Sequence, residues 1–201
     1  MMLNDTYGDC TIAGAGHMIV AANALVNGSD PIPTDPEIQQ EYFAETGGPD
    51  SGCVEADVLK NWYTRGLFQM NTGNVCSTNK IAGYAPVNPQ SIRDVQQAIA
   101  FYGGCYIGVQ LPQSAQQQFG EGDQWTVVPG SPIEGGHCVL YVAYDAHNLY
   151  AVTWGAVIAV AYPWHAAYCD ETWAVIPQAF VEAGHGPTLD LKSLQSDISQ
   201  L

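Results

Sequence analysis

The sequence predicts an α+β fold, with a helical N-terminal half packed on a β-rich C-terminal half that contains an antiparallel sheet. Two observations lead to this prediction. Capped segments with helical periodicity fill most of residues 1–104, and short β-like runs separated by turns follow from residue 105 onward. A chain of 201 residues can bury one sizeable core. We therefore expect a single domain over residues 1–201, with a mainly helical lobe up to residue 104 and a mainly β lobe from residue 105.

The clearest helix is predicted at residues 10–26, where Ala and other small apolar residues occur on nearly every side. This pattern is typical of a buried helix. Asp9 is placed to cap its start, and Asn27-Gly28 to end it. Helical periodicity, N-caps and glycine stops predict three more helices, at residues 36–46, 54–65 and 92–101. Residues 68–87 alternate only weakly, which favours short strands or loop.

The composition of the chain changes after Gly103-Gly104. Runs rich in β-branched and aromatic residues predict strands at residues 105–111, 137–144, 149–154, 156–162 and 172–176. The polar segment 112–135 between the first two strands is expected to be mostly loop. Two helices, at residues 178–183 and 189–201, are expected to complete the chain.

The charge balance excludes two classes of partner. The chain has 20 acidic residues and only five basic ones, for a net charge of −15. So few cations cannot neutralise a run of phosphates or dock on an anionic membrane surface, so we expect neither nucleic-acid nor membrane binding. The chain has no long apolar stretch and no basic region before an apolar one at its start. We therefore expect a cytoplasmic or virion-associated protein without a signal peptide.

Six cysteines, at positions 10, 53, 76, 105, 138 and 169, are spread along the chain without any C-x-x-C pair. None lies near a histidine at zinc-finger spacing, so we expect no metal site and no cofactor. Three disulfides remain possible in an oxidising compartment, whereas buried free thiols are the usual state in a chain of this size.

Cys10 and His137 are the candidates for chemistry. Cys10 opens the predicted buried helix, where the positive end of the helix dipole is expected to lower the thiol pKa. His137 follows Gly135-Gly136 at the start of a predicted strand, where the glycines leave room for a substrate beside the imidazole. A thiol and an imidazole brought together from the two halves of the chain are what nucleophilic acyl transfer requires.

The motifs around these two residues resemble those of the papain-like cysteine peptidases. Asn4 lies six residues before Cys10, at the position of the family's oxyanion-hole Gln, and the family's later motifs match Gly135-Gly136-His137, Ala143-Tyr144-Asp145 and Val152-Thr153-Trp154-Gly155. The chain also resembles uncharacterised bacterial and phage-encoded papain-like proteins, which share Gly8-Asp9-Cys10-Thr11, Val152-Thr153-Trp154-Gly155 and Tyr168-Cys169-Asp170-Glu171. The resemblance implies a papain-like fold with Cys10 as nucleophile, His137 as general base, Asn4 as oxyanion donor and Trp154 as a shield over the histidine.

The group that would orient His137 is left open by the sequence. The family's orienting Asn aligns with Val152, which cannot accept a hydrogen bond, and Thr153 follows it. Neighbouring residues of a strand face opposite ways, so only one of the two can point at His137. Away from these motifs, we interpret His17 as a core histidine and Asp170-Glu171 as a solvated acidic turn.

The function predicted from these features is that of a cysteine peptidase or amidase acting on a peptide or protein. Val152 at the orienting position keeps a second interpretation open, a non-catalytic papain-like scaffold in an assembly such as a phage virion, for example as a capsid decoration. A third is a peptidoglycan endopeptidase, which would use the same Cys-His chemistry. The sequence identifies no particular substrate and no oligomeric state.

Overall fold

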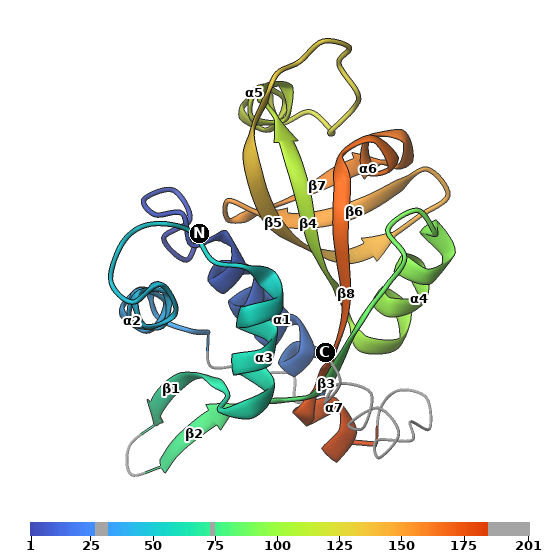
Figure 1. Cartoon of the computed structure of the whole chain (residues 1–201). Coiled ribbons are helices and arrows are strands. Elements are labelled where there is room, and N and C mark those ends of the chain that lie inside the picture. Colours follow the sequence, from blue (N-terminus) through green and yellow to red (C-terminus); the bar gives the residue numbers. More distant parts are fainter. Residues whose placement is uncertain (27–31, 73–74, 185–201) are drawn as a thin grey trace.

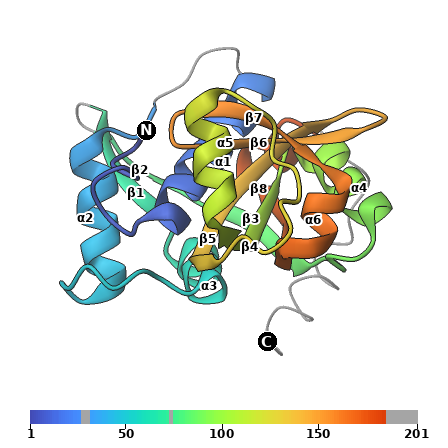
Figure 2. The same cartoon turned by 90° about the horizontal axis from the view of Figure 1, so that it is seen from above.

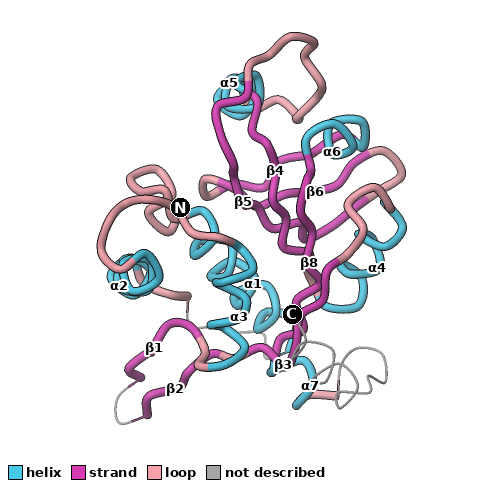
Figure 3. Tube along the Cα trace, viewed as in Figure 1, coloured by secondary structure: helices cyan, strands magenta, loops and turns pink. Residues whose placement is uncertain are grey.

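A computed structural model describes residues 1–26, 32–72 and 75–184, and it confirms the α+β class. The three N-terminal helices gather on one side of the molecule, and the large sheet lies on the other (Figures 1 and 3). The helical side contains α1 (Cys10–Val26), α2 (Asp35–Thr46) and α3 (Glu55–Thr64), followed by a hairpin of β1 (Leu67–Thr72) and β2 (Val75–Asn79). The second half is built on one large sheet. The extent of the domain over residues 1–201 stays a prediction.

The large sheet has six antiparallel strands in the order β3-β8-β4-β5-β6-β7. Their bounds are Ile81–Pro86 for β3, Cys105–Pro112 for β4, Ile133–Tyr144 for β5, Asn148–Thr153 for β6, Ala156–Ala161 for β7 and Cys169–Pro177 for β8. The strands β4 and β8 are therefore neighbours although about 60 residues separate them in sequence. This pairing brings Gly108 opposite both Cys138 and Glu171.

Four further helices lie around the sheet: α4 (Ile92–Tyr102), α5 (Gln113–Glu121), α6 (Tyr162–Tyr168) and α7 (Gln178–Glu182). Two of them correct the sequence prediction. The expected loop 112–135 contains α5. After β7, where no helix was predicted, the chain forms α6, and Asp170-Glu171, expected as a turn, lies in β8. The expected helix at 189–201 and the expected helix stop at Asn27-Gly28 lie outside the described residues.

The two faces of the sheet bury two separate hydrophobic clusters. One cluster joins α1, α2 and α3 to β4 and β5, through buried residues such as Ile12, Trp62 and Leu140. The other lies on the opposite face, where α4 and α6 pack around Trp125 and Trp164. Figure 2 shows the same arrangement seen from above, with α1 between α2 and the sheet. Cys10, the first residue of α1, therefore belongs to a helix that packs against β5, the strand that carries His137.

Close approach of α1 to the sheet depends on a glycine. A Cβ at Gly14 would lie 3.0 Å from the ring of Tyr106 and 3.2 Å from Sγ of Cys138. The Tyr106 hydroxyl donates a 2.6 Å hydrogen bond to the Thr11 carbonyl, which fixes the first turn of α1 to β4. Small residues on α1, read from sequence as a sign of burial, therefore set the distance between helix and sheet.

Candidate active site

The predicted site residues meet in one groove between the helical side and the sheet. The groove has a volume of about 560 Å³, and its walls come from the start of α1, the segment before α3, and the ends of β4, β5 and β8. Cys10, His137, Asn4 and Trp154 all line it, as the sequence predicted that they would lie together. Glu55, Gly108 and Glu171 line it as well. The first two were not singled out from the sequence, and Glu171 was expected in a solvated acidic turn.

Cys10 begins α1, and its thiol is half-buried in the groove. Burial raises the pKa of this thiol to about 11, and the negative charges of Glu55 and Asp9 act in the same direction. A hydrogen bond from the Cys138 backbone N–H opposes the shift but does not overcome it. The expectation that the helix end would lower the thiol pKa is therefore wrong, because burial outweighs the polarity of the helix end. The resting thiol is protonated.

His137 lies on β5, opposite Val109 of β4, with only 8% of its surface exposed. Burial lowers its pKa to about 4, so the imidazole is neutral at physiological pH. Its Nε2 is 2.9 Å from Oγ1 of Thr153, while Nδ1 makes no hydrogen bond within the described part of the chain. The indole of Trp154 stacks on the ring with a centroid separation of 4.8 Å and an interplanar angle of 21°. The imidazole is thus oriented from two sides, with Nδ1 left for a proton.

Thr153, and not Val152, contacts His137. Alternate residues of β6 face opposite sides of the sheet, and the buried ones are Leu149, Ala151 and Thr153. Val152 faces the other way and packs against the cluster that contains residues of α1. A two-residue turn of Trp154 and Gly155 follows, with φ of 45° and 76°, and it joins Thr153 to its pairing partner Ala156. Positive φ at both positions is the type I′ hairpin geometry, and it directs the Trp154 indole over the imidazole.

Asn4 lies in the groove, but one of its amide hydrogens is already used. Its Nδ2 donates a 3.1 Å hydrogen bond to Oδ1 of Asp9, whose Oδ2 is buried without a partner among the described residues. Burial raises the pKa of Asp9 to about 6, although the bond from Asn4 lowers it. An amide carries two N–H groups, so Asn4 retains one donor for a substrate oxygen. Asp9, expected as a helix cap, thus anchors Asn4.

The loop before Cys10 is tied to the helical side by Asp50. Its Oδ1 accepts hydrogen bonds from the Gly8 backbone N–H at 3.0 Å and from the Tyr42 hydroxyl at 2.5 Å. These bonds hold the segment between Asn4 and Cys10 in one place relative to α2. Nothing in the local sequence pattern indicates this contact, because it joins residues that are 42 positions apart.

Glu55 is the least expected residue of the groove. It is the first residue of α3 and only 6% exposed, whereas an acid in a first helical turn is ordinarily solvated and interacts with the helix dipole. Burial, followed by the charge of Glu171, raises its pKa to about 8. Its position depends on Gly108 in β4, whose missing side chain leaves the space that the carboxyl occupies. This relation exists only in the folded chain.

The expectations about metals, disulfides and membranes can be compared with the described residues. These contain no group of three or more His, Cys, Asp or Glu side chains that could hold a metal ion. The cysteines at positions 10, 53, 105, 138 and 169 are free thiols. No helix in ranges 1–26, 32–72 and 75–184 is long and apolar enough to cross a bilayer.

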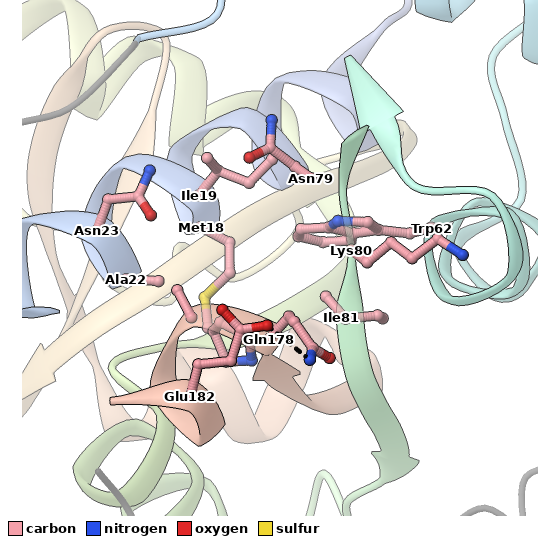
Figure 4. Close-up of a pocket in the computed structure, with 12 residues that line it drawn as sticks. Met18, Ile19, Ala22, Asn23, Trp62, Asn79, Lys80, Ile81, Gln178 and Glu182 are labelled. Carbon is pink, nitrogen blue, oxygen red and sulfur yellow. Dashed lines mark hydrogen bonds between the residues drawn. The ribbon is translucent and has the colours of Figure 1, made fainter. Parts of the chain in front are cut away.

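A second cavity, of about 440 Å³, lies at the other end of α1. Figure 4 shows Met18, Ile19, Ala22 and Asn23 of α1 on one side of it, with Trp62 opposite and Gln178 donating to Glu182 at 3.0 Å. Its lining mixes apolar groups with amides and one charge of each sign, and it holds no thiol or imidazole. The groove containing Cys10 is therefore the candidate active site.

Comparisons with known proteins agree on the fold. The model superposes on xylellain, a cysteine protease from Xylella fastidiosa, with a TM-score of 0.65 and 18% identity, covering 85% of this chain and 80% of that one. For the cysteine protease CMS1MS2 of Carica candamarcensis, solved in complex with E-64, the TM-score is 0.59 at 18% identity, over 85% and 88% of the two chains.

A third similar structure contains the cysteine protease and lectin-like domains of Cwp84, a surface layer associated protein of Clostridium difficile. Its TM-score is 0.62 at 11% identity, and the match covers 86% of this chain and 48% of that one. No family model and no curated protein matches the chain. These likenesses show that the chain has the fold of the papain-like cysteine proteases.

Proposed function

We propose that this chain, which has the papain-like fold, is a cysteine peptidase or amidase in which Cys10 attacks a carbonyl carbon and His137 takes the thiol proton. The observation that carries the proposal is the orientation of His137. Its Nε2 is engaged by Thr153 and its face is covered by Trp154, while Nδ1 stays available in the groove that Cys10 lines. A base held in this way in the same groove as a thiol supports nucleophilic catalysis.

The resting pair is neutral, which sets the order of events. The thiol of Cys10 is protonated and His137 is unprotonated, so proton transfer accompanies the attack on the carbonyl. The neutral imidazole with a proton on Nε2 donates to Thr153 and presents the Nδ1 lone pair to the thiol. After the transfer, the hydroxyl of Thr153 still accepts from Nε2, which stabilises the imidazolium.

The oxyanion formed by the attack needs hydrogen-bond donors. The second amide hydrogen of Asn4 and the backbone N–H at the start of α1 supply two, because both lie at the thiol end of the groove. His137 then returns its proton to the leaving amine, and water releases the acyl group from Cys10. Each step uses a group that lines the groove.

Replacing Cys10 tests the proposal against a matched control. Cys10→Ala is expected to abolish hydrolysis of a fluorescently labelled unfolded protein such as casein. Cys53→Ala should keep the activity, although Cys53 is another half-buried thiol of the same groove. Unchanged hydrolysis by Cys10→Ala, or a folded wild-type protein without activity on any of a range of peptide and protein substrates, would contradict the proposal and favour the scaffold interpretation.

Thr153 gives a finer test, because two substitutions separate its shape from its hydroxyl. Thr153→Val keeps the volume but leaves Nε2 of His137 without a partner, so kcat/KM should fall about tenfold to a hundredfold, or roughly 1.4 to 2.7 kcal/mol. Thr153→Ser keeps the hydroxyl and should stay within about threefold of wild type. Equal activities of the valine and serine variants would show that the hydrogen bond has no role in orienting the base.

A further inference from the structure

One wall of the groove carries three acidic residues and no cation. Glu55 comes from α3, and Asp170 and Glu171 come from β8. All three line the groove together with Cys10 and His137, and neither Lys nor Arg is among the lining residues. We call Glu55, Asp170 and Glu171 the acidic wall. In a chain with 20 acidic residues such a surface patch alone would mean little, so the argument depends on how Glu55 is placed.

The sheet register places Glu55 directly over Gly108. Gly108 of β4 pairs with Cys138 on one side and with Glu171 on the other, so the three form one row across the sheet. A Cβ at Gly108 would lie 2.9 Å from Oε1 of Glu55 and 3.0 Å from Cβ of Glu171. The carboxyl of Glu55 therefore occupies the gap above the glycine, beside Glu171.

One carboxyl oxygen of Glu55 accepts no hydrogen bond from the described residues. The side chain is only 6% exposed, and Oε2 is buried without a hydrogen-bond partner among the described residues. A buried acceptor in this condition is costly, about 1–3 kcal/mol and more when it is charged. The structure thus contains a buried carboxyl oxygen in the groove that lacks a donor.

The other two acids of the wall are held only by neutral donors. Oε1 of Glu171 accepts from the Trp173 indole at 2.6 Å, and Oδ2 of Asp170 accepts from the Gln110 amide at 2.6 Å. In the described part of the chain, the ion pairs are those of Arg65 with Glu41 and Glu45, and Arg65 lies at the opposite end of α3 from Glu55. The charge of the acidic wall is therefore not compensated by any described basic side chain.

We propose that the acidic wall binds an arginine side chain of the substrate, with Glu55 and Glu171 contacting the guanidinium over Gly108. This inference rests on the proposed function and names the substrate class of that site. The planar guanidinium has several N–H donors and can bond two carboxylates at once, including the unpartnered oxygen of Glu55. The groove that these acids line has a volume of about 560 Å³, which leaves room for the guanidinium beside them.

Binding at the wall changes the charge of Glu55. Its pKa of about 8 leaves the carboxyl mostly protonated at pH 7, and a guanidinium beside it favours the ionised form. The ionised carboxyl and the cation then offset each other near Cys10, so the preference for arginine should appear in KM rather than in kcat.

Matched peptide pairs test this proposal. A fluorogenic series carries a single arginine at successive positions around the cleaved bond, and each peptide has a counterpart with citrulline, which has nearly the same shape without the charge. At one position, wild type should prefer arginine by about tenfold or more in kcat/KM. The double variant Glu55→Gln with Glu171→Gln should lose most of that preference. Asp94→Asn, an exposed acid on α4 at the other face of the sheet, removes a charge elsewhere and should keep it.

A binding measurement separates this proposal from the proposed catalysis. The Cys10→Ala protein is titrated with the arginine and citrulline peptides in a calorimeter at pH 7, in buffers of different ionisation enthalpy. Burial and Glu171 raise the pKa of Glu55 to about 8, so binding the cation should release a proton from that carboxyl. Adding Glu55→Gln to this protein should remove both the tighter binding of the arginine peptide and the proton release.

The outcomes are distinct. If wild type hydrolyses no peptide but Cys10→Ala still binds arginine peptides more tightly than citrulline peptides, the catalytic proposal is wrong and the acidic wall stands. If wild type hydrolyses peptides without preferring arginine at any position, the acidic wall proposal is overturned while the peptidase assignment stands. A preference that survives the double variant also overturns the proposal.

Discussion

His137→Ala is expected to lower kcat/KM by roughly 10³- to 10⁴-fold, because the thiol of Cys10 loses the base proposed to take its proton. The effect should be large for this protein in particular, since the pKa of Cys10 is raised to about 11 and little thiolate exists without a base. A thiol with a low pKa would retain part of its reactivity in the same variant.

His137→Gln is the matched control for packing. Glutamine fills much of the same space and can still hydrogen-bond the Thr153 hydroxyl, but it cannot accept the proton. Both variants should therefore lose activity to a similar extent while their circular dichroism spectra match that of wild type. If either variant retained more than about a tenth of wild-type activity, His137 would not be the general base.

Glu55→Gln is expected to stabilise the protein at alkaline pH, which is the second large effect. The pKa of Glu55 is about 8 in the folded chain against 4.5 as its ordinary value. The folded state therefore keeps a proton that the unfolded state releases, and the free energy of unfolding falls as pH rises from 4.5 toward 8. Glutamine does not titrate, so the variant lacks this decline.

Urea denaturation at pH 5 and pH 9 measures the difference. Glu55→Gln should resemble wild type at pH 5 and exceed it by about 4 kcal/mol at pH 9, since a pKa raised from 4.5 to about 8 costs about 1.4 kcal/mol per pH unit across that range. The exposed control Asp94→Asn should change stability little at either pH. A Glu55→Gln variant no more stable than wild type at pH 9 would mean that the carboxyl is not held in a buried position.

Much of the fold could be predicted because local signals and tertiary structure agree. The small apolar residues of α1 indicated a buried helix, and its bounds match the prediction of residues 10–26. The helices α5 and α6 were missed for opposite reasons. The first is rich in glutamine and lacks an apolar periodicity that would distinguish it from loop, and the second contains aromatic residues that are typical of strands.

The site was predictable only in part, for a physical reason. The order of the motifs predicted Cys10 and His137. The choice between Val152 and Thr153 depends on which face of β6 is buried, and a shift of the strand register by one residue would reverse that choice. The placement of Glu55 over Gly108 depends on the pairing of β4 with β5 and β8, which the sequence does not contain in any local pattern. The raised pKa of Cys10 likewise follows from burial in the assembled groove.

The central claim, that His137 activates the thiol of Cys10, is tested most directly by the rate at which a peptidyl vinyl sulfone attaches to the protein. Intact-mass measurement and peptide mapping of wild type should find one adduct, on Cys10. The rate should fall at least about a hundredfold in His137→Ala, because the base is missing. An adduct on Cys53 instead of Cys10, or equal rates in wild type and His137→Ala, would contradict the account.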